Sequence, residues 1–464
     1  MKILLINTTT GFDPLTSKEN DYRIKLSLSP PIGLLYIARS FEDDGHEVKV
    51  IDYSCEENPN KEIQKSLDSY DAIGLEVLTD NRNYVEKIAK SIKDYDNDLP
   101  VLLGGPHCTF HPQKTLIDIP SGDISVEGEG EIVVKELVKG LNGYKNYEKL
   151  PGVYYRKNSK IKKGKPAEYI KNIDEISFPS RHLVEKYEYG KIGRQNFYKQ
   201  KSTAILTSRG CPNNCKFCTR HITSNYFRMR SAENVIDELS EIKEKYKSVF
   251  IADDNFLASK KRSTKIFDEL IKMGSPLDLY INGARVDSAN NDLYKKMKIA
   301  GVKHIYFGIE SGNQSVLDYY NKNINIEQIK TAVKLANKMD FITLGYFILG
   351  APFETYKHIK KSIKFSLNLP LDFAIFYPLS YSKGSDLWDE AVKKKKINKD
   401  EDCYGIIASS EKGLANFTES ELLDLCKKAY KKFYYRPSYL FRQIYKSLKR
   451  IDFTILKYWI NYNT

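Results

Sequence analysis

Three cysteines lie within eight residues of one another in the segment TSRGCPNNCKFCTR at 207–220. Cys211, Cys215 and Cys218 have the spacing C-x3-C-x2-C, and the aromatic residue Phe217 stands immediately before the last cysteine. Iron–sulfur clusters are usually held by four thiolates, so three thiolates on one short loop hold three irons of a cube and leave the fourth iron open. An open coordination position is what a catalytic metal centre requires. The spacing therefore predicts a catalytic [4Fe–4S] cluster.

A structural zinc site is the alternative interpretation of these cysteines. His221 follows the loop and is available as a fourth zinc ligand. A structural zinc site has no need of a β-strand before it or of a run of strand–helix units after it. Both flank this loop, which favours the cluster.

The cysteine loop follows one apolar segment and precedes five others. These six predicted strands are 203–208, 248–253, 279–284, 304–309, 342–349 and 372–378. Segments with helical spacing of apolar residues separate them. Six such units predict a partial (β/α)6 barrel, and the chemistry of a barrel lies at the carboxyl ends of its strands.

The first third of the chain alternates between strand and helix patterns as well. Its predicted strands are 2–7, 47–52, 72–78, 100–105 and 123–128. This alternation predicts a doubly wound, Rossmann-like parallel sheet with helices on both faces. The predicted parts of the chain are a sheet domain at 1–145, a linker with a hairpin at 146–200, the barrel at 201–395 and a helical C-terminal region at 396–464.

The cysteine loop resembles the signature of the radical S-adenosylmethionine (SAM) superfamily. The resemblance implies that SAM chelates the open iron and is cleaved to a 5′-deoxyadenosyl radical. It also implies SAM-binding residues at the ends of successive strands, namely Phe217, Asp253, Asp254, Arg285, Glu310, Ile348 and Gly350. In the segment 346–354, Tyr346 replaces the first glycine of the family pattern G-x-I-x-G-x3-E, which Ile348, Gly350 and Glu354 match. Acidic residues at strand ends also cap helices, which is the alternative for each carboxylate.

The segments 29–52, 102–110 and 126–131 resemble the cobalamin-binding domain that precedes the barrel in one large radical SAM subfamily. That subfamily includes cobalamin-dependent methylases and the anaerobic magnesium-protoporphyrin ester cyclase. The resemblance implies cobalamin contacts from Leu78, Gly104, Gly105, His107 and Gly128.

Two features of the first domain depart from the motifs of the cobalamin-binding family that it resembles. The loop after the first strand reads NTTTGF and lacks the D-x-H-x-x-G motif whose histidine ligates cobalt. Glu76 stands where the family's S-x-L motif has serine, and a glutamate beside a buried ligand needs a partner or a raised pKa.

The basic charge of the chain is concentrated at its C-terminus. Residues 427–464 contain ten Lys or Arg and one acidic residue, a net +9 of the chain's +13. Apolar residues recur there at near-helical spacing, at Phe441, Ile444, Leu448, Ile451, Ile455 and Trp459. A basic amphipathic helix predicts peripheral membrane contact through 437–464. Packing of the apolar face on the barrel and binding of RNA are the alternatives.

These features together predict a cobalamin-dependent radical SAM methyltransferase that acts on an unactivated carbon of an apolar or lipid-like small molecule. The partner would be an external electron donor such as flavodoxin or ferredoxin, and nucleic acid is not expected. A radical SAM cyclase or mutase without methyl transfer is the alternative enzyme. An RNA methylthiotransferase would carry three cluster cysteines in residues 1–145, where only Cys55 and Cys108 occur. A non-enzymatic cobalamin sensor would have no use for the cysteine loop.

The sequence contains no run of about 20 apolar residues that would span a bilayer. Its first residues, MKILLINTTT, lack the features of a signal peptide. These observations predict a cytoplasmic protein, peripheral on the inner face of the membrane if the tail binds lipid.

Overall fold

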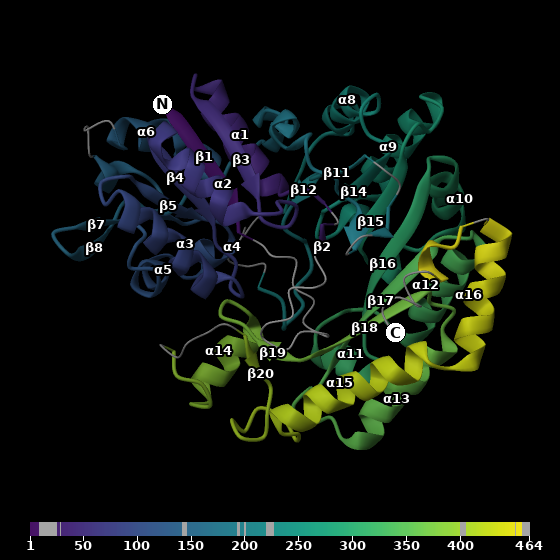
Figure 1. Ribbon diagram of the computed structural model, residues 1–464. Helices are drawn as coiled ribbons and strands as arrows, with labels where there is room; N and C mark the ends of the chain where they lie inside the picture. The colour runs from purple at the N-terminus through teal and green to yellow at the C-terminus, as the bar shows by residue number, and fades with distance from the viewer. Residues whose placement is uncertain are drawn as a thin grey trace. The chain divides into compact units, whose positions relative to one another are not determined.

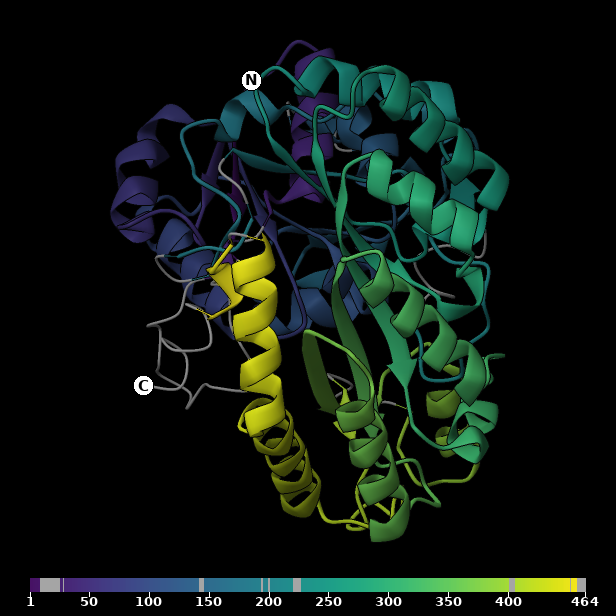
Figure 2. The same cartoon turned by 90° about the vertical axis from the view of Figure 1, so that its right-hand side faces the viewer.

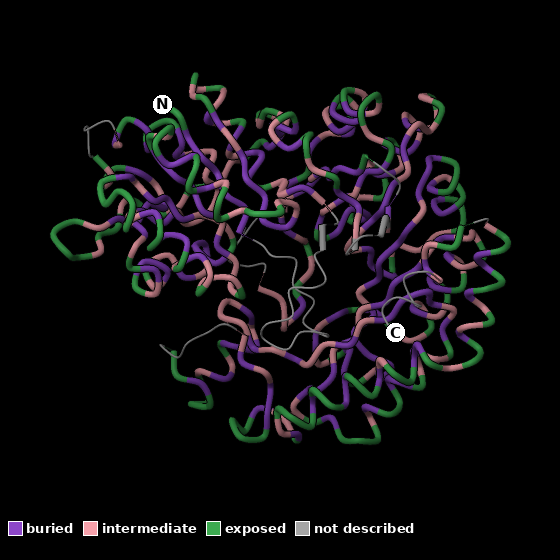
Figure 3. The backbone as a smooth tube through the Cα atoms, in the orientation of Figure 1, coloured by how far each residue is buried: buried purple, intermediate pink, exposed green. Residues whose placement is uncertain are grey.

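The computed structural model describes residues 1–8, 26–27, 29–141, 146–192, 195–198, 201–219, 227–399, 405–450 and 452–456 (Figure 1). The chain divides into two compact units, one made largely of residues 1–194 and the other largely of residues 195–464. In each unit the central parallel strands are largely buried and the outer faces of the helices are exposed (Figure 3). The finer boundaries at 145, 200 and 395 remain predictions.

The first unit is built on a seven-stranded sheet. Its parallel strands are β1 (Lys2–Asn7), β3 (Glu47–Asp52), β4 (Ala72–Glu76), β5 (Val101–Gly104) and β6 (Ile124–Val126). They lie in the order β3-β1-β4-β5-β6, so the progress of the chain across the sheet reverses between β1 and β4. In open α/β sheets, ligands bind beyond the carboxyl ends of the strands at such a reversal point. The hairpin β7 (Val153–Lys157) and β8 (Lys160–Lys163) extends the sheet in the antiparallel sense beyond β6.

Helices cover both faces of this sheet. They are α1 (Ile32–Asp43), α2 (Pro59–Ser66), α3 (Arg82–Tyr95), α4 (Pro106–Phe110), α5 (Pro112–Asp118) and α6 (Val134–Lys139). Successive side chains of a strand point to opposite faces of a sheet. In β1, Leu4 and Ile6 accordingly belong to one hydrophobic core, whereas Ile3 and Leu5 belong to another. Two cores on opposite faces confirm the predicted doubly wound domain.

The second unit is built on a six-stranded parallel sheet. The strands are β11 (Ser202–Ile205), β14 (Ser248–Ile251), β15 (Asp278–Ala284), β16 (Val302–Glu310), β17 (Ile342–Leu349) and β18 (Phe373–Pro378). Their spatial order is their chain order, with β11 and β18 at the edges, which confirms the partial (β/α)6 barrel. The connecting helices line the outer side of the sheet (Figure 2). They are α8 (Ala232–Ile242), α9 (Lys260–Lys272), α10 (Asn291–Ile299), α11 (Gln314–Tyr319), α12 (Ile326–Lys338) and α13 (Tyr356–Asn368).

The C-terminal region consists of α14 (Asp386–Lys393), α15 (Glu419–Tyr434) and α16 (Pro437–Arg450), with a small antiparallel pair, β19 (Ser380–Tyr381) and β20 (Ile406–Ile407). Helix α15 packs along the edge strand β18. The Tyr434 hydroxyl accepts a hydrogen bond from the Ala374 backbone N–H and donates one to the Ala374 carbonyl, both at 3.0 Å. These bonds cover an edge that would otherwise leave backbone groups unpaired.

Helix α16 packs on the barrel through a polar face. The Asp372 carboxylate accepts hydrogen bonds from Lys446 at 2.8 Å and Gln443 at 3.1 Å, and all three side chains are buried. The apolar face points away, because Phe441, Ile444 and Leu448 are exposed. The alternative in which these three residues pack on the barrel is therefore wrong, since a buried carboxylate selects a polar partner.

The remaining apolar residues predicted for the C-terminal helix are Ile451, Ile455 and Trp459. Ile455 is buried against the core of the second unit, as the packing alternative predicts for that residue. Ile451 and Trp459 lie outside the described residues, as does His221. Within the part of the chain that is described, no helix is long and apolar enough to cross a membrane.

Candidate active site

The cysteine loop follows β11 at the carboxyl end of the barrel and is held by backbone contacts on both sides. Cys215 is buried, and its carbonyl accepts a hydrogen bond from the Cys218 backbone N–H at 3.0 Å. The backbone N–H of Lys216 donates to the Tyr320 carbonyl, and its carbonyl accepts from the Leu387 N–H, both at 3.0 Å. The loop is therefore fastened to the segment after α11 and to the start of α14, which fixes the spacing of the thiols.

Asp253 lies at the end of β14 and holds the start of the cysteine loop. One carboxylate oxygen accepts from the Thr207 N–H at 2.6 Å, and the other accepts from the Thr207 and Ser208 hydroxyls at 2.5 and 2.6 Å. Burial raises the pKa of this carboxyl, and those hydrogen bonds oppose the rise. Both oxygens are thus engaged, so these contacts favour a positioning role over a direct contact with SAM.

Asp254 differs from its neighbour. Its side chain is exposed, and it makes no hydrogen bond or ion pair within the described residues. Surrounding protein raises the pKa of the Asp254 carboxyl, and the charge of Asp253 adds to the rise. Asp254 is therefore the carboxylate of this pair that remains available to a ligand.

A buried ion pair lies beside the cysteine loop. The Lys322 ammonium is 2.7 Å from a carboxylate oxygen of Glu310, and it lies 5.8 Å from the centre of the Phe217 ring. Glu310 has φ +64°, a left-handed conformation that costs energy for a residue with a side chain and is concentrated at functional sites. The Arg285 guanidinium donates to the Lys322 carbonyl at 2.7 Å and pairs with Asp287 at 2.8 Å. The structure thus brings Phe217, Glu310 and Arg285 together around Lys322.

Sequence patterns did not identify Lys322, because it lies in an irregular segment between α11 and α12 that carries no motif. Burial raises the pKa of the Cys215 thiol, and the Lys322 and Arg285 cations oppose the rise. Nearby cations favour the thiolate, which is the form of cysteine that binds metal. Only the tertiary fold places this lysine near a cysteine more than 100 positions earlier in the sequence.

The segment after β17 forms a tight turn around a buried glutamate. Glu354 accepts hydrogen bonds from the backbone N–H groups of Gly350 and Ala351 at 2.8 and 2.9 Å. Its other oxygen is buried and has no hydrogen-bond partner in the described residues. Burial raises the pKa of Glu354 to about 7, and the two backbone bonds oppose the rise. Gly350 has φ +102°, and a Cβ there would collide with Leu422.

Ile348 and Tyr346 lie two residues apart on β17, so their side chains share one face of the strand. Ile348 and Phe217 pack against the same hydrophobic cluster, and their contact with SAM remains a prediction. Tyr346 lies beside Tyr377 of β18, with ring centres 6.4 Å apart and nearly parallel planes. An aromatic wall therefore occupies the place where the family pattern has glycine.

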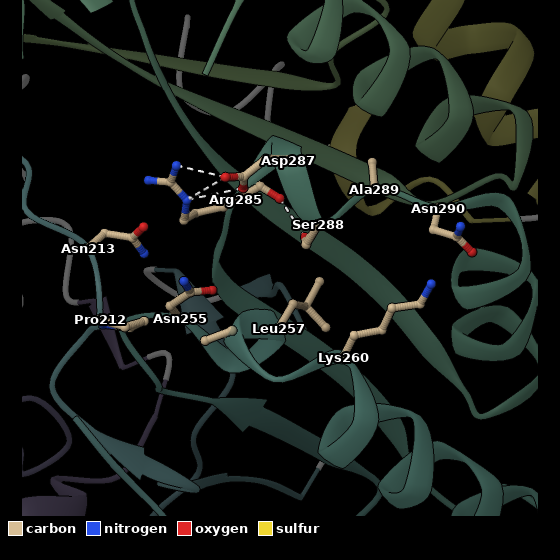
Figure 4. Close-up of a pocket in the computed structure, with 11 residues that line it drawn as sticks. Pro212, Asn213, Asn255, Leu257, Lys260, Arg285, Asp287, Ser288, Ala289 and Asn290 are labelled. Carbon is tan, nitrogen blue, oxygen red and sulfur yellow. Dashed lines mark hydrogen bonds and ion pairs between the residues drawn. The ribbon is translucent and has the colours of Figure 1, made fainter. Parts of the chain in front are cut away.

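A cavity of about 450 Å³ opens beside the cysteine loop at the ends of β14 and β15. Figure 4 shows the Arg285 guanidinium and the Asn213 and Asn255 side chains around this space. The remaining lining residues are Pro212, Leu257, Ala258, Lys260, Asp287, Ser288, Ala289 and Asn290. The Asn255 side-chain oxygen is buried without a hydrogen-bond partner in the described residues. This buried acceptor is therefore available to a ligand or a water molecule in the cavity.

The three cysteines fit an iron–sulfur cluster better than a single metal ion. No set of three Cys, His, Asp or Glu side chains within the described ranges surrounds one ion. A [4Fe–4S] cluster does not require such a set, because each of its thiolates ligates a different iron. The Asn213 amide is 3.4 Å from the Cys211 sulfur, a polar contact of the kind that tunes such clusters.

The carboxyl end of the first sheet has an open backbone surface. A Cβ at Gly104 would meet no atom within 4 Å, so the fold itself does not require this glycine. Gly105 has φ +108°, and its Cβ would lie 3.1 Å from the Val77 carbonyl, so glycine is required there. Bare backbone beside a reversal point of the sheet fits a bulky cofactor such as cobalamin.

Other predicted cobalamin residues are engaged within the protein. His107 is fully buried, with Nδ1 3.2 Å from the Thr79 hydroxyl, and burial lowers its pKa to about 4. The Leu78 backbone N–H donates to the Asn81 side chain at 2.8 Å. Gly128 has φ +85° and donates its N–H to the Thr109 hydroxyl at 3.2 Å. These contacts support structural roles, and cofactor contacts at the three positions remain predictions.

Comparison with known proteins gives the same division of the chain. A B12-binding domain model matches residues 26–138, and a radical SAM superfamily model matches residues 205–366. The chain is 33% identical over 452 residues to an uncharacterized methyltransferase of Pyrococcus horikoshii, covering 96% of this chain and 95% of that protein. It is 25% identical over 431 residues to the cytidylyl-2-hydroxyethylphosphonate methyltransferase of Streptomyces wedmorensis, covering 81% and 80%.

Two solved structures share the fold. The radical SAM enzyme OxsB with aqua-cobalamin and SAM bound has a TM-score of 0.71 at 18% identity, covering 92% of this chain and 66% of that one. The methyltransferase TsrM of Kitasatospora setae with cobalamin and a [4Fe–4S] cluster bound has a TM-score of 0.68 at 15% identity, covering 85% and 78%. Because the Pyrococcus relative is similar over nearly the whole length of both chains, the protein belongs to the radical SAM enzymes in which a B12-binding domain precedes the barrel, and its cofactors are a [4Fe–4S] cluster, SAM and cobalamin.

Proposed function

We propose that the protein transfers a methyl group to an unactivated carbon of a small, apolar or lipid-like molecule. The observation that carries this proposal is the 33% identity over 96% of the chain to a Pyrococcus horikoshii protein whose name is that of a methyltransferase. A hopanoid C-3 methylase of Methylococcus capsulatus, 25% identical over 335 residues, is a relative whose name indicates a lipid substrate.

The residues around the cysteine loop have separate tasks in this proposal. When bound, the cofactors supply a carbon-centred radical and the methyl group. Cys211, Cys215 and Cys218 hold three irons, and Asp253 holds the start of their loop. Glu310 and Arg285 bind SAM, with Lys322 fixing the orientation of Glu310.

Other side chains shape and close the pocket. Ile348 and Phe217 provide apolar packing beside SAM, and Gly350 lets the backbone pass close to it. The exposed Asp254 carboxylate is available to a polar group of SAM or substrate. Tyr346 and Tyr377 exclude water from the floor of the barrel and offer flat surfaces to an apolar substrate.

The experiment that tests methyl transfer uses the full chain reconstituted anaerobically with iron, sulfide and cobalamin. The enzyme is incubated with SAM labelled in its methyl group, a chemical reductant and lipid or polar extracts. Label in an extracted molecule, together with 5′-deoxyadenosine, supports the proposal. Formation of 5′-deoxyadenosine with an unlabelled, rearranged product would replace it with the cyclase or mutase alternative, and Cys215→Ala should abolish either result.

Radical SAM enzymes act on small-molecule substrates and require a reductant. We propose that flavodoxin or ferredoxin supplies the electron, because low-potential clusters are reduced by carriers of similarly low potential. Reduced flavodoxin should replace dithionite in the SAM-cleavage assay. A complete lack of 5′-deoxyadenosine with both carriers would contradict this choice.

We further propose that α16 contacts the surface of an anionic membrane, on the inner face in the cytoplasmic arrangement that the sequence predicts. Its outward face consists of Phe441, Ile444, Tyr445 and Leu448, whose exposed fractions are 73%, 37%, 67% and 61%. Exposed lysines are present at Lys449 on the same helix and on the preceding helix α15, at Lys427, Lys428, Lys431 and Lys432. An apolar stripe bordered by cations is the pattern of helices that lie in the headgroup region of anionic bilayers.

Sedimentation with vesicles tests this contact. The wild-type chain should bind phosphatidylglycerol-containing vesicles and not pure phosphatidylcholine vesicles. The double variant Phe441→Ser, Leu448→Ser should weaken binding more than about tenfold, since each large apolar side chain contributes roughly 1.5–3 kcal/mol when buried. Ile299→Ser on α10 is the matched control, because Ile299 is 62% exposed on another helix. Equal binding by both variants, or retention of RNA in place of vesicles, would refute the membrane assignment.

A further inference from the structure

Glu76 is the last residue of β4 and lies at the point where the order of the first sheet reverses. It pairs with Gly104 of β5 in the strand register. Its backbone carbonyl accepts a hydrogen bond from the Thr8 hydroxyl at 2.6 Å, which joins the ends of β4 and β1. Its Cγ would be 3.3 Å from a Cβ on Gly105, so the side chain lies directly beside the open glycine backbone.

The Glu76 carboxyl has no partner of its own. It makes no hydrogen bond or ion pair within the described part of the chain, although the residue is half-buried. The carboxylate of Asp52, at the end of β3, is the contrasting case. It accepts hydrogen bonds from Asn7 at 2.9 Å, from the Ser54 N–H and hydroxyl at 2.9 and 2.7 Å, and from Tyr189 at 2.8 Å. Within the described residues, the fold therefore provides donors for the Asp52 carboxylate and none for the Glu76 carboxyl.

Among the described residues, the charged group that acts on the Glu76 carboxyl is the carboxylate of Asp52. Burial raises the pKa of Glu76 to about 7, and the charge of Asp52 adds to the rise. Burial also raises the pKa values of Asp52 and Tyr189, and it lowers the pKa of His107 to about 4. Tyr189 and His107 therefore stay neutral between pH 6 and pH 8.5. Glu76, by contrast, changes its charge within that range.

We propose that Glu76 binds cobalamin as a neutral carboxylic acid, donating a hydrogen bond to an acceptor of the cofactor. A neutral carboxyl has one O–H donor, whereas a carboxylate has acceptors only. Cobalamin is rich in acceptors, which are the amide carbonyls of the corrin and the phosphate oxygens of its nucleotide tail. Ionised Glu76 has no donor to offer those groups and must lose its hydration beside a bulky ligand. This role does not depend on which reaction the barrel performs.

The affinity of the protein for cobalamin should therefore depend on pH. If the neutral form alone binds, a pKa of about 7 makes the apparent Kd about 30-fold larger at pH 8.5 than at pH 6. Because the protonated form of Glu76 binds, the affinity for cobalamin is highest below pH 6 and decreases as the pH rises through 7. Glu76→Gln keeps an N–H donor and cannot ionise, so its affinity should not change over this range.

The test is equilibrium dialysis of the full chain against cyanocobalamin at pH 6, 7, 7.75 and 8.5. Cyanocobalamin is the probe, and the assay requires neither the cluster nor SAM, so its outcome is separate from that of methyl transfer. Glu47→Gln is the matched control, because Glu47 is an exposed glutamate at the opposite end of β3. It should retain the wild-type pH dependence.

Two results would overturn the inference. One is wild-type binding that is absent or that changes less than about threefold across the range. The other is a Glu76→Gln variant that keeps the wild-type pH dependence. Glu76→Ser removes the ionisable group in the same way but shortens the side chain. It should bind without pH dependence, and circular dichroism of both variants will show that the first domain is folded.

Discussion

The Lys322–Glu310 ion pair predicts a specific consequence of the change Lys322→Met. Both side chains are less than a tenth exposed, and their charged atoms are 2.7 Å apart. Removing one partner of a buried pair leaves the other charge uncompensated and costs about 3–5 kcal/mol. Glu310 would then take up a proton or turn toward solvent. The variant should therefore lose that much unfolding free energy and, in the reconstituted enzyme, bind SAM at least tenfold more weakly.

Urea denaturation of the unreconstituted chain measures the first effect, and equilibrium dialysis of labelled SAM against the reconstituted enzyme measures the second. The double variant Lys322→Met, Glu310→Gln removes both charges, so it should recover most of the lost stability without recovering SAM binding. Lys322→Arg keeps the charge and should lie close to wild type in both assays. The reasoning is refuted if Lys322→Met unfolds like the wild type, or if the double variant binds SAM normally.

Three other predictions follow from the same geometry. Cys215→Ala should lose the iron and the cluster absorbance after reconstitution while retaining cobalamin, whereas Cys426→Ala, a buried cysteine on α15, should retain both. Burial raises the pKa of Glu354 from an ordinary 4.5 to about 7. The contribution of Glu354 to the free energy of unfolding should therefore be complete below pH 4.5 and fall by on the order of 3 kcal/mol as the pH rises to 7. Urea denaturation at several pH values should show this slope in the wild type and a smaller one in Glu354→Gln; equal slopes would contradict the assignment. Gly104→Ala should change the free energy of unfolding by less than about 0.5 kcal/mol, because the added Cβ meets no atom within 4 Å. The same change should weaken cobalamin binding, and normal binding in dialysis would place the cofactor elsewhere.

Much of the fold could be predicted because its signals are local. Apolar runs such as 342–349 and 304–309 identify strands by composition alone, and their alternation with helical segments indicates parallel sheets. The hairpin at 153–163 was expected within the linker, but its place beside β6 was not. Which strand an edge hairpin joins depends on non-local pairing, and no pattern within the hairpin encodes that choice.

The candidate site was predicted less completely than the fold. Asp253 and Asp254 were expected at the end of a strand, but the division of tasks between them depends on Thr207 and Ser208 at the start of the cysteine loop. Asn255 follows them directly, and its buried oxygen, which has no partner in the described residues, becomes evident only once the walls of the cavity are known. Spacing predicts which residues reach the ends of strands, and packing decides what each of them contacts.

The C-terminal helix shows the difference between what the sequence predicts and what the tertiary structure decides. The sequence by itself predicted a basic amphipathic helix within residues 437–464, because helical periodicity is a property of consecutive residues, and the structure has a helix at Pro437–Arg450. It also predicted the cluster ligands, because three thiolates on one short loop need no distant partner. Only the tertiary structure decided that the apolar face of α16 points outward, since the buried Asp372 carboxylate takes Lys446 and Gln443 as partners. Likewise, only the fold placed Lys322 against Glu310 and left Glu76 without a donor among the described residues. Electrostatic and hydrogen-bonding energies depend on distances between residues that are far apart in the chain.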